Sequence, residues 1–311
     1  MSTVLATSFA TLLEELDLNV HPSGTAATIG EETIEAPSLA ELRPKLYTAL
    51  YAQLHVRNSD LEALGRAAIR PDLLEPLVEA IPHRHVVAVA SEASTAVRVA
   101  PHLRTILVDD LKVLVDLEQA IQDDRGTIIG VRLPSWRTHT TPGYVLALGQ
   151  RGIGRGNLVR FYISRSFAGD TLALWSSLLT GLNDAGVAYH AKALSSSSAY
   201  PRSDAVVVYT TTTDRFKTLE IVTRVLELGT ASGPPMSIFA EEIVPGLAEA
   251  AEPMDLRTAY RRLSFGQHRS RVLADAMIRA NYEQRTLTSV WDEEARAARI
   301  DPHHPGRNLA S

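Results

Sequence analysis

The sequence predicts an α+β protein in which an N-terminal helical region precedes a mixed β-sheet with packed helices. Three observations support this fold class. Apolar residues recur at helical spacing near the N-terminus, short β-branched runs begin at residue 85, and both patterns alternate between residues 157 and 228. We therefore expect a helical region over residues 1–80, an α+β domain over 81–300 and a tail over 301–311.

The composition excludes several classes of protein. Hydrophobic residues make up 45% of the 311 residues and charged residues 22%, which is ordinary for a globular chain. A net charge of −5 argues against binding to nucleic acid or to an anionic membrane, because both require a basic field. The chain has no Cys, no apolar run of the ~18–20 residues that span a membrane, and no basic N-terminal start. We expect a cytoplasmic protein.

The N-terminal third shows helical periodicity. Apolar residues at spacings of three and four predict helices in four segments: 4–17, 39–55, 59–68 and 72–81. Ser38 followed by Glu41 fits a capping box at the start of the second helix. Residues 21–38 are rich in Pro, Gly, Thr and Ser and are predicted to form a linking loop. This region is either a helical subdomain with a purely structural packing role or a docking surface for a peptide or partner.

Residues 85–149 change to short β-branched runs, which predict strands. The four runs are HVVAVA at 85–90, TILVDDLKVLVD at 105–116, TIIGVRLP at 127–134 and GYVLALG at 143–149. Arg132, Trp136, Arg137 and His139 are expected in a loop after the third run. The basic turn at 151–156 contains GIGRG, which lacks the dinucleotide-binding spacing and precedes a strand. It is either a hairpin turn or a phosphate loop.

The stretch from 157 to 209 reads as strand, amphipathic helix, strand, polar loop and strand. Side chains alternate along a strand, so Val159, Phe161 and Ile163 share one face. Arg160, Tyr162 and Ser164 share the other face, and His190 and Lys192 point one way on the next strand. We expect the apolar rows to meet a helix at about 170–185, which leaves the polar rows on the opposite side of one sheet. Arg202 immediately precedes the third strand.

These cations and hydroxyls on one sheet face form a candidate site for an anion, in the first place a phosphate. The C-terminal part adds further cations. Ser264 and Gln267 predict the capped start of a strong helix, whose first two turns carry His268, Arg269 and Arg271. Free N–H groups and the helix dipole favour anions there. The alternative is that these charges are simply solvated.

The remaining C-terminal segments are less informative. A helix is predicted at about 214–228, and the Pro- and Gly-rich residues 230–255 are predicted to form a long ordered loop. The end of the chain, with His303 and His304, is expected to be an extended or disordered tail and not a metal site.

Several segments together resemble the Hop-type effector-like family, over roughly residues 40–305. The matching segments are LYTALYAQ at 46–53, VRFYIS at 159–164, K-A-L at 192–194, AYPRSDAVVVY at 199–209 and SFGQHRSRVLADA at 264–276. Members of this family are homologues of a type III secretion effector. They act as the lyase component of class V lanthipeptide synthetases and in thioamitide biosynthesis, and are distantly similar to phosphothreonine lyases.

The resemblance implies a phosphate elimination that gives dehydroalanine or dehydrobutyrine. It assigns Lys192 as the base that removes the α-proton and Arg202 as a phosphate ligand. The lyases have a histidine acid at the position of Ser164, so the resemblance leaves the proton donor open. From the chemistry, Tyr162, His190 or His268 can donate a proton or a hydrogen bond. Further arginines can bind the phosphate through paired N–H groups: Arg160, Arg269 and Arg271.

We therefore expect a lyase domain that requires no metal or cofactor and acts on a phosphorylated precursor peptide. The sequence contains no kinase signature, so the resemblance implies a separate peptide kinase as a partner, in a complex with this chain. Two alternatives remain. The chain could be a non-catalytic scaffold that binds a phosphopeptide or leader peptide and activates the kinase. It could also be a secreted effector that acts on a host phosphoprotein.

Overall fold

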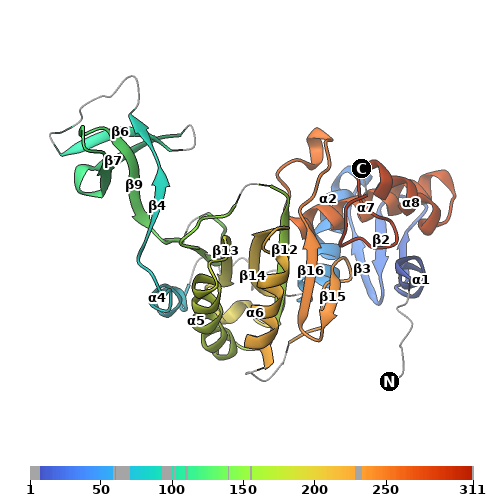
Figure 1. Ribbon diagram of the computed structural model, residues 1–311. Coiled ribbons are helices and arrows are strands. Elements are labelled where there is room, and N and C mark those ends of the chain that lie inside the picture. The colour runs from blue at the N-terminus through green and yellow to red at the C-terminus, as the bar shows by residue number, and fades with distance from the viewer. Residues whose placement is uncertain are drawn as a thin grey trace.

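A computed structural model describes residues 8–58, 60, 71–92, 100, 102–108, 111–138, 140–154, 156–227 and 233–309 (Figure 1). A central seven-stranded sheet carries two helices on one face and is joined to N- and C-terminal elements on its other side. A small β subdomain projects from the opposite end of the molecule. The predicted α+β class is confirmed.

The central sheet is antiparallel in every pairing between its described strands. Its strand order is β10 (Trp136–Arg137), β11 (Tyr144–Leu148), β13 (Tyr189–Leu194), β14 (Arg202–Thr211), β12 (Leu158–Arg165), β16 (Leu247–Ala251) and β15 (Glu241–Val244). The register places Tyr162 and Lys192 on either side of Val207. One row further along, Arg160 and His190 lie on either side of Tyr209. The sheet therefore aligns the predicted polar residues in two adjacent rows.

The apolar face of this sheet packs against α5 (Ala168–Asp184) and α6 (Arg215–Glu227), as the alternation predicted. Phe161 of β12 and Val208 of β14 are fully buried in the same cluster as the helix side chains. Trp175 of α5 is also fully buried, and its indole N–H donates to the Leu77 carbonyl at 3.0 Å. That bond fixes α4 (Leu74–Glu79) to α5.

The polar face is covered over only part of its width. On the β12–β16 side, Tyr162 and Ala248 join a core with α2 (Leu39–Leu50) and α7 (Phe265–Glu283). The helix α8 (Leu287–Ala297) and α1 (Phe9–Glu15) complete that core. On the β13–β11 side, His190, Lys192, Leu146 and Leu148 are only half-buried. The open part of the polar face therefore lies around Lys192.

Both predicted N-cap residues are present, although only the second belongs to a complete capping box. Ser38 accepts from the Glu41 N–H at the start of α2, and Ser264 and Gln267 form a complete capping box at the start of α7. A π-helix, η1 (Tyr51–Val56), extends α2, so the prediction of a helix over 39–55 is confirmed. The predicted helix at 72–81 corresponds to α4. The predicted helix at 59–68 lies outside the described residues apart from residue 60.

Two predicted loops are wrong. The segment 21–38 contains β2 (Ala26–Ile29) and β3 (Glu32–Glu35), which form a sheet with β1 (Leu18–Val20). The segment 230–255 contains β15 and β16. These strands are three to five residues long, and their formation depends on packing against other elements. Ile29 of β2, for example, is buried against the core of α2 and α7. Such a dependence leaves little local signal.

The projecting subdomain consists of two small antiparallel sheets. One contains β4 (His85–Val89), β9 (Ile128–Pro134) and β8 (Ala120–Gln122). The other contains β5 (Ser91–Glu92), β6 (Leu103–Val108) and β7 (Leu111–Asp116), and the short helix η2 (Leu117–Gln119) joins β7 to β8. Their shared core includes Ile106 and Val131. The predicted strands are confirmed, although the run at 105–116 is a hairpin of two strands.

The expected loop after the third run is also wrong. Arg132 belongs to β9, and Trp136 and Arg137 form β10. Ser135 is therefore the single residue that separates the last strand of the subdomain from the first strand of the central sheet. His139 and Arg155 lie outside the described residues. The turn at 151–154 precedes β12 as predicted.

The C-terminal segment 301–309 is ordered and returns toward β16, contrary to a disordered tail. The Asn308 amide donates to the Glu252 carbonyl at 2.8 Å, and Pro305 and Gly306 are buried. His303 and His304 are exposed, as expected. Short 3-10 turns, η3 (Ser197–Ala199) and η4 (Thr258–Tyr260), complete the described structure, in which no helix has the length and apolar character needed to cross a membrane.

Trp175 offers a test of the α5 packing. Trp175→Ala removes a fully buried ring and its bond to Leu77, so we expect the free energy of unfolding to fall by about 3–5 kcal/mol. Phe216→Ala, at an exposed position on α6, should change it by less than about 0.5 kcal/mol. Urea denaturation followed by circular dichroism measures both values. Equal effects of the two substitutions would contradict this packing.

Candidate functional site

Lys192 lies at the centre of the open part of the polar face. Its Nζ is 4.1 Å from the ring centroid of Tyr144, which comes from the neighbouring strand β11. The guanidinium of Arg202 lies over the same ring, with its Cζ 5.5 Å from the centroid. Among the described residues, Lys192 has no carboxylate within ion-pair distance. The structure thus brings the two residues together that the resemblance assigned as base and phosphate ligand.

Arg202 is held by a buried carboxylate. Its Nε and Nη2 donate to the two oxygens of Asp204 at 2.7 and 2.9 Å, and Tyr144 donates to the same carboxylate at 2.9 Å. Burial alone would raise the pKa of Asp204, but the charge and hydrogen bonds of Arg202 hold it well below its usual value. Asp204 in turn raises the pKa of Arg202, although burial opposes this. Arg202 is therefore a fixed cation whose Nη1 is not used by Asp204.

The π-helix η1 contributes two residues that the sequence analysis missed, Tyr51 and His55. The Nδ1 of His55 is 2.8 Å from the Ser237 hydroxyl, and its ring lies edge-on to Tyr162 with centroids 5.3 Å apart. Gly266 at the start of α7 packs so closely that any side chain there would overlap the His55 ring. Tyr51 and His55 are four residues apart, so the helical spacing in the sequence could have indicated that they share one face of the helix.

His55 is neutral because of where it is buried. It is 3% exposed, and burial lowers its pKa from 6.5 to about 4. The positive charges of Arg202, Lys192 and Arg160 lower the pKa further, whereas Asp204 opposes them. Burial and the nearby Asp204 raise the pKa of Tyr51 to about 12, against the opposing effect of Arg202. Both side chains are therefore neutral near pH 7 and can donate hydrogen bonds.

Arg160 and Tyr162 lie beside this cluster on β12. The Nε of Arg160 donates to Glu252 at 2.7 Å, and its guanidinium lies over the Tyr209 ring at 5.1 Å. Burial raises the pKa of Tyr162 far above its usual value, although Arg160 opposes this. Tyr162 therefore remains protonated near pH 7 and can donate a hydrogen bond.

His190 shares this face two residues before Lys192. It is half-buried and lies opposite Tyr209 in the ladder. Burial, together with the charge of Arg137 on β10, lowers the pKa of His190. It is neutral near pH 7.

The start of α7 forms a chain of buried contacts. Arg269 is fully buried and donates through Nε to the Pro305 carbonyl at 2.7 Å and through Nη1 to Nδ1 of His268 at 2.8 Å. Nε2 of His268 lies 3.0 Å from Asp255, so both ring nitrogens are engaged. Burial lowers the pKa of Arg269 to about 9 and that of His268 to about 4. His268 is therefore placed to orient Arg269.

Two residues considered in the sequence analysis, Arg271 and Ser164, have side chains that make contacts away from Lys192. Arg271 donates to the Ala259 carbonyl at 2.8 Å and lies over the Tyr260 ring, so the structure does not bring it together with Lys192. The Ser164 hydroxyl is buried and donates to the Pro234 carbonyl at 2.7 Å. The position that the resemblance connects with the acid is therefore covered by the backbone.

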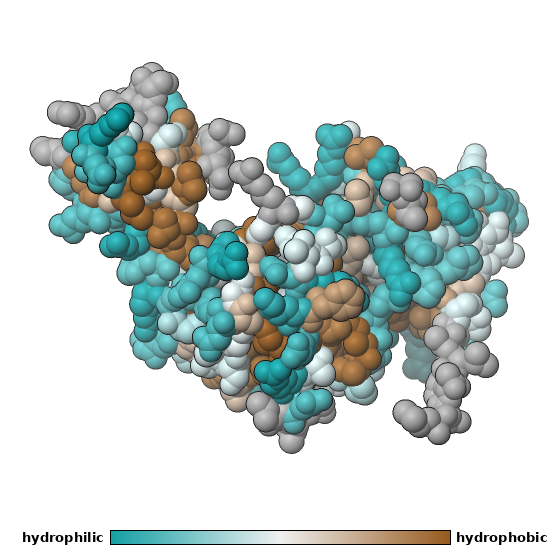
Figure 2. All heavy atoms as spheres, in the orientation of Figure 1, coloured by the Kyte–Doolittle hydropathy of each residue, from teal (hydrophilic) through white to brown (hydrophobic). Residues whose placement is uncertain are grey.

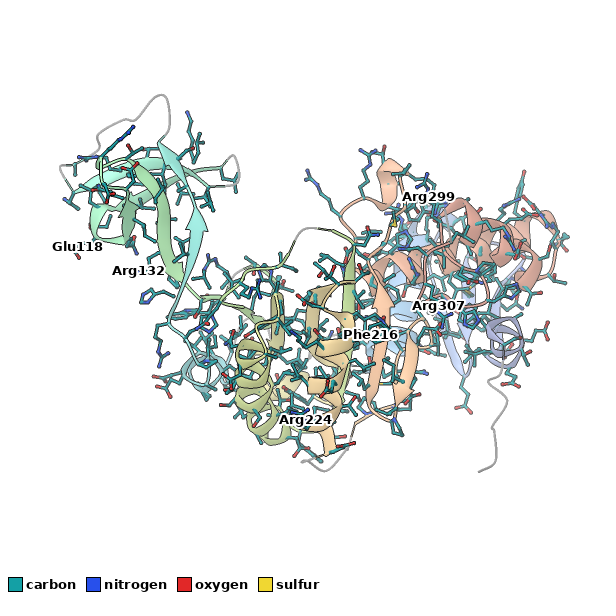
Figure 3. The ribbon with its side chains drawn as sticks, in the orientation of Figure 1. Glu118, Arg132, Phe216, Arg224, Arg299 and Arg307 are labelled. Atoms are coloured by element: carbon teal, nitrogen blue, oxygen red, sulfur yellow. The ribbon has the colours of Figure 1, made fainter. Side chains whose placement is uncertain are left out.

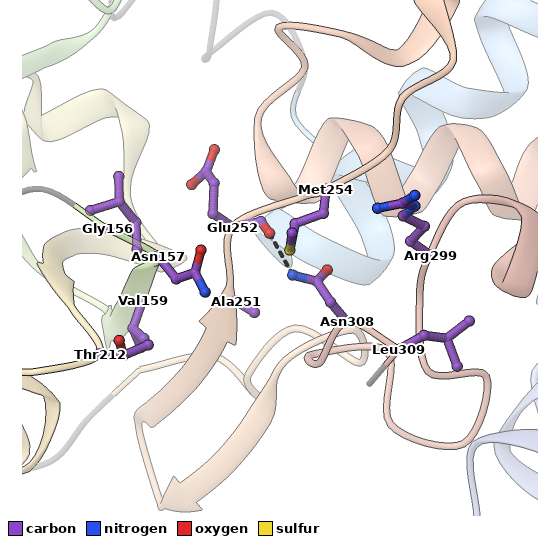
Figure 4. Close-up of a pocket in the computed structure, with 11 residues that line it drawn as sticks. Gly156, Asn157, Val159, Thr212, Ala251, Glu252, Met254, Arg299, Asn308 and Leu309 are labelled. Carbon is purple, nitrogen blue, oxygen red and sulfur yellow. Dashed lines mark hydrogen bonds between the residues drawn. The ribbon is translucent and has the colours of Figure 1, made fainter. Parts of the chain in front are cut away.

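An open depression of about 760 Å³ lies at the end of the sheet near the start of β12 (Figure 4). Its wall includes Glu252, the partner of Arg160, and Asn308, which donates to the Glu252 carbonyl. Met254, Leu309 and Arg299 complete the wall that faces Asn157. The depression adjoins the cluster through the Arg160–Glu252 pair and does not include Lys192.

Together, the fold and this face define an α+β protein whose central sheet carries a cluster of cations on one face. The sequence profile of the HopA1 effector protein family matches residues 136–307, which is more than half of the chain. The protein belongs to the HopA1 effector protein family. The match includes every candidate site residue on the sheet and on α7, and excludes η1.

Two solved structures of effector proteins from Pseudomonas syringae are similar to this chain. The effector protein from Pseudomonas syringae pv. tomato strain DC3000 superposes with a TM-score of 0.50 at 12% identity, over 89% of this chain and 92% of that one. The effector protein from Pseudomonas syringae pv. syringae strain 61 gives 0.46 at 11% identity, over 81% and 83%. No curated protein matches significantly. At such identities the first structure supports a shared fold only.

The buried histidines predict a pH dependence of stability. The unfolded chain takes up protons on His55 and His268 as the pH falls through 6.5, whereas the folded protein does so only near pH 4. The free energy of unfolding should therefore fall as the pH decreases from 6.5 to 4, by roughly 3 kcal/mol for His55. His55→Gln should weaken this dependence, and His303→Gln, at an exposed site, should not. Urea titrations across this pH range measure it; identical slopes for the two variants would exclude the buried neutral His55.

Proposed function

We propose that this protein is a lyase that eliminates phosphate from phosphoserine or phosphothreonine in a peptide, giving dehydroalanine or dehydrobutyrine. The observation that carries the proposal is the position of Lys192. Its amino group shares the Tyr144 ring with Arg202, on a face that also holds Arg160 and Tyr162. The groups proposed as base, phosphate ligand and neutral donors thus lie together on one sheet.

The reaction breaks two bonds and forms one double bond. Lys192 removes the α-proton, the C–H electron pair forms the Cα–Cβ double bond, and the Cβ–O bond breaks with its pair on the leaving phosphate. Lysine can act in this way only without its proton, and a peptide that covers Lys192 and excludes water would favour that form. The former bridging oxygen takes up a proton from a donor as the bond breaks, so that the dianionic phosphoester leaves as hydrogen phosphate, HPO4²⁻.

Arg202 and Arg160 are the proposed phosphate ligands. Each guanidinium has five N–H donors, and the carboxylate of Asp204 or Glu252 uses only some of them. Burial and these carboxylates hold both groups in place, so a phosphate would meet donors that are already oriented. Arg269, held by His268 behind Phe265, adds a further positive charge to this side of the site.

Neutral donors supply the remaining role. Negative charge develops on the amide oxygen of the substrate as its α-proton leaves, and a fixed hydrogen bond stabilises that charge. Tyr162 and His55 both remain neutral near pH 7 and contact each other edge-on. We assign this role to one of these two groups, with His190 as a further donor on the open side. Arg271 has no part in the proposal because it lies with Tyr260.

The phosphate on the peptide has to come from another protein. We propose a separate peptide kinase as the partner, and a ribosomal precursor peptide as the substrate in lanthipeptide or thioamitide biosynthesis. The resemblance of SFGQHR and of Tyr200 through Ala205 to the lyase components of those pathways supports this setting. Membership of an effector family supports a second setting, in which the same elimination acts on a host phosphoprotein.

The same pairs fit a non-catalytic function as well. Arg202 and Arg160, held by carboxylates, can bind a phosphopeptide whether or not Lys192 acts as a base. Such a scaffold would activate the partner kinase and leave the phosphorylated peptide intact. Mass spectrometry separates the two functions, because only a lyase removes the elements of phosphoric acid from a phosphorylated peptide.

Lys192→Ala is the direct test. We expect the precursor peptide, phosphorylated by its kinase, to lose phosphoric acid with the native protein and to remain phosphorylated with the variant. Loss of a general base should reduce the rate roughly 10²–10⁴-fold. Lys217→Ala, on the far side of the sheet on α6, is the matched control and should convert the peptide normally.

Full conversion by Lys192→Ala would exclude Lys192 as the base. No conversion by the native protein, with tight binding of the phosphorylated peptide, would support the scaffold instead. A thiol added to the reaction traps the dehydro residue and confirms the product by a second change in mass.

A further inference from the structure

The projecting subdomain has a strand with one unused edge. β4 pairs with β9 on one side, and no described strand pairs with its other side. Ala90 donates to the Ile129 carbonyl and Ser135 donates to the Arg84 carbonyl, which identifies the even-numbered residues of this segment as those bonded to β9. Hydrogen-bonded and non-bonded pairs alternate in an antiparallel ladder. The N–H and C=O groups of His85, Val87 and Val89 therefore point toward the free edge.

The side chains beside that edge are apolar and exposed. Val87 is 62% exposed and Val89 84%, although valine in a folded chain is usually buried. Gly130 lies opposite Val89 on β9, so no side chain there covers the valine. Figure 2 shows apolar surface over this part of the subdomain. Natural edge strands commonly carry a lysine or proline that prevents pairing, and β4 has neither.

This edge is connected to the candidate site through the sheet. β9 passes through Ser135 into β10, the edge strand of the central sheet. Arg137 of β10 lies opposite Leu146, and Leu146 lies opposite Lys192. All three side chains are only half-buried, so the open polar face leads from Lys192 to the base of the subdomain.

We propose that β4 binds an extended segment of the peptide substrate as an added antiparallel strand. The segment would supply backbone partners for Val87 and Val89 and place apolar residues at alternate positions against them. Arg132, exposed opposite Val87 on β9 (Figure 3), gives this surface a cationic border that favours an acidic residue in the same segment. This inference rests on the proposed function, because it names where a peptide substrate binds outside the reacting residue.

A peptide substrate fits the position of this edge better than a second copy of the chain does. A peptide that passes over Lys192 and leaves past Arg137 reaches the subdomain directly, whereas pairing of two β4 strands would make no use of that path. Binding away from the reacting residue would also let one site process several residues along a peptide. Pairing between two copies is an outcome that the experiment distinguishes.

The test measures peptide affinity separately from turnover. Two fluorescein-labelled probes share one phosphothreonine: a long peptide of about 20 residues with Val–Thr repeats on both sides, which spans ~66 Å when extended, and a short one of about 7 residues. Fluorescence anisotropy gives their dissociation constants in the Lys192→Ala background, where conversion does not interfere. We expect the long probe to bind more tightly than the short one.

Val87→Lys with Val89→Lys should weaken binding of the long probe by roughly 2- to 30-fold, the loss expected for two cross-strand pairs, and leave the short probe unaffected. Leu111→Lys with Leu114→Lys is the matched control, because these residues of β7 are 69% and 50% exposed in the same subdomain. Val87→Pro removes one N–H donor from the free edge without removing a bond to β9, and should also weaken the long probe. Circular dichroism confirms that each variant is folded.

Equal affinity of the long and short probes, or equal effects of the β4 and β7 variants, would overturn the docking inference and leave the lyase proposal standing. Tight, β4-dependent binding without any conversion by the native protein would support peptide docking and overturn the lyase proposal. Sedimentation velocity without peptide completes the test: a dimer that the β4 substitutions dissociate would assign this edge to a second copy and overturn peptide docking.

Discussion

The buried pair of Arg202 and Asp204 is the interaction on which the candidate site depends. A charge removed from water is tolerated only when it is paired and hydrogen-bonded, and Arg202 and Asp204 are only 5% and 3% exposed. Asp204 also accepts from Tyr144 on β11, and the neighbouring Ser203 hydroxyl donates to the His55 carbonyl. The start of β14 thus joins the open half of the polar face to the π-helix that brings Tyr51 and His55. Disturbing the pair would affect both halves at once.

Much of this arrangement follows from periodicity. The period of two along β12 separates Phe161 from Arg160 and Tyr162, and the structure has the apolar row against α5 and the polar row on the opposite face. The capping box at Ser264 likewise follows from local chemistry. The strands at 26–35 and 241–251 could not be predicted in this way, because their short length and burial depend on contacts with distant helices. His55 was missed because helical spacing places it on one face with Tyr51 but does not show that this face meets the sheet.

Sequence patterns also overstate how free the cations are. Read along the chain, Arg160, Arg202 and Arg269 look like equivalent candidates for a phosphate clamp. In the structure the first two are paired with Glu252 and Asp204, and the third is bonded to a backbone carbonyl and to His268. Asp204 lies two residues from Arg202, and alternation along a strand places both side chains on one face, but the strand was predicted to begin after Arg202 and in fact begins at Arg202. Lys192 differs from all three, because its nearest described partner is the Tyr144 ring.

This difference has a chemical consequence. A phosphate dianion that binds beside Arg202 gains from donors that Asp204 has already oriented, but it also meets the charge of that carboxylate. The net attraction therefore depends on the cations without such close partners, and Lys192, which shares the Tyr144 ring with Arg202, is one of these among the described residues. Lys192 must lose its proton before it can act as a base, so part of that attraction is missing until Lys192 takes up the α-proton. If the peptide is also bound at a second place, away from the reacting residue, its affinity depends less on the charge of Lys192. A second peptide contact therefore allows Lys192 to be uncharged, as a base must be, without loss of the substrate.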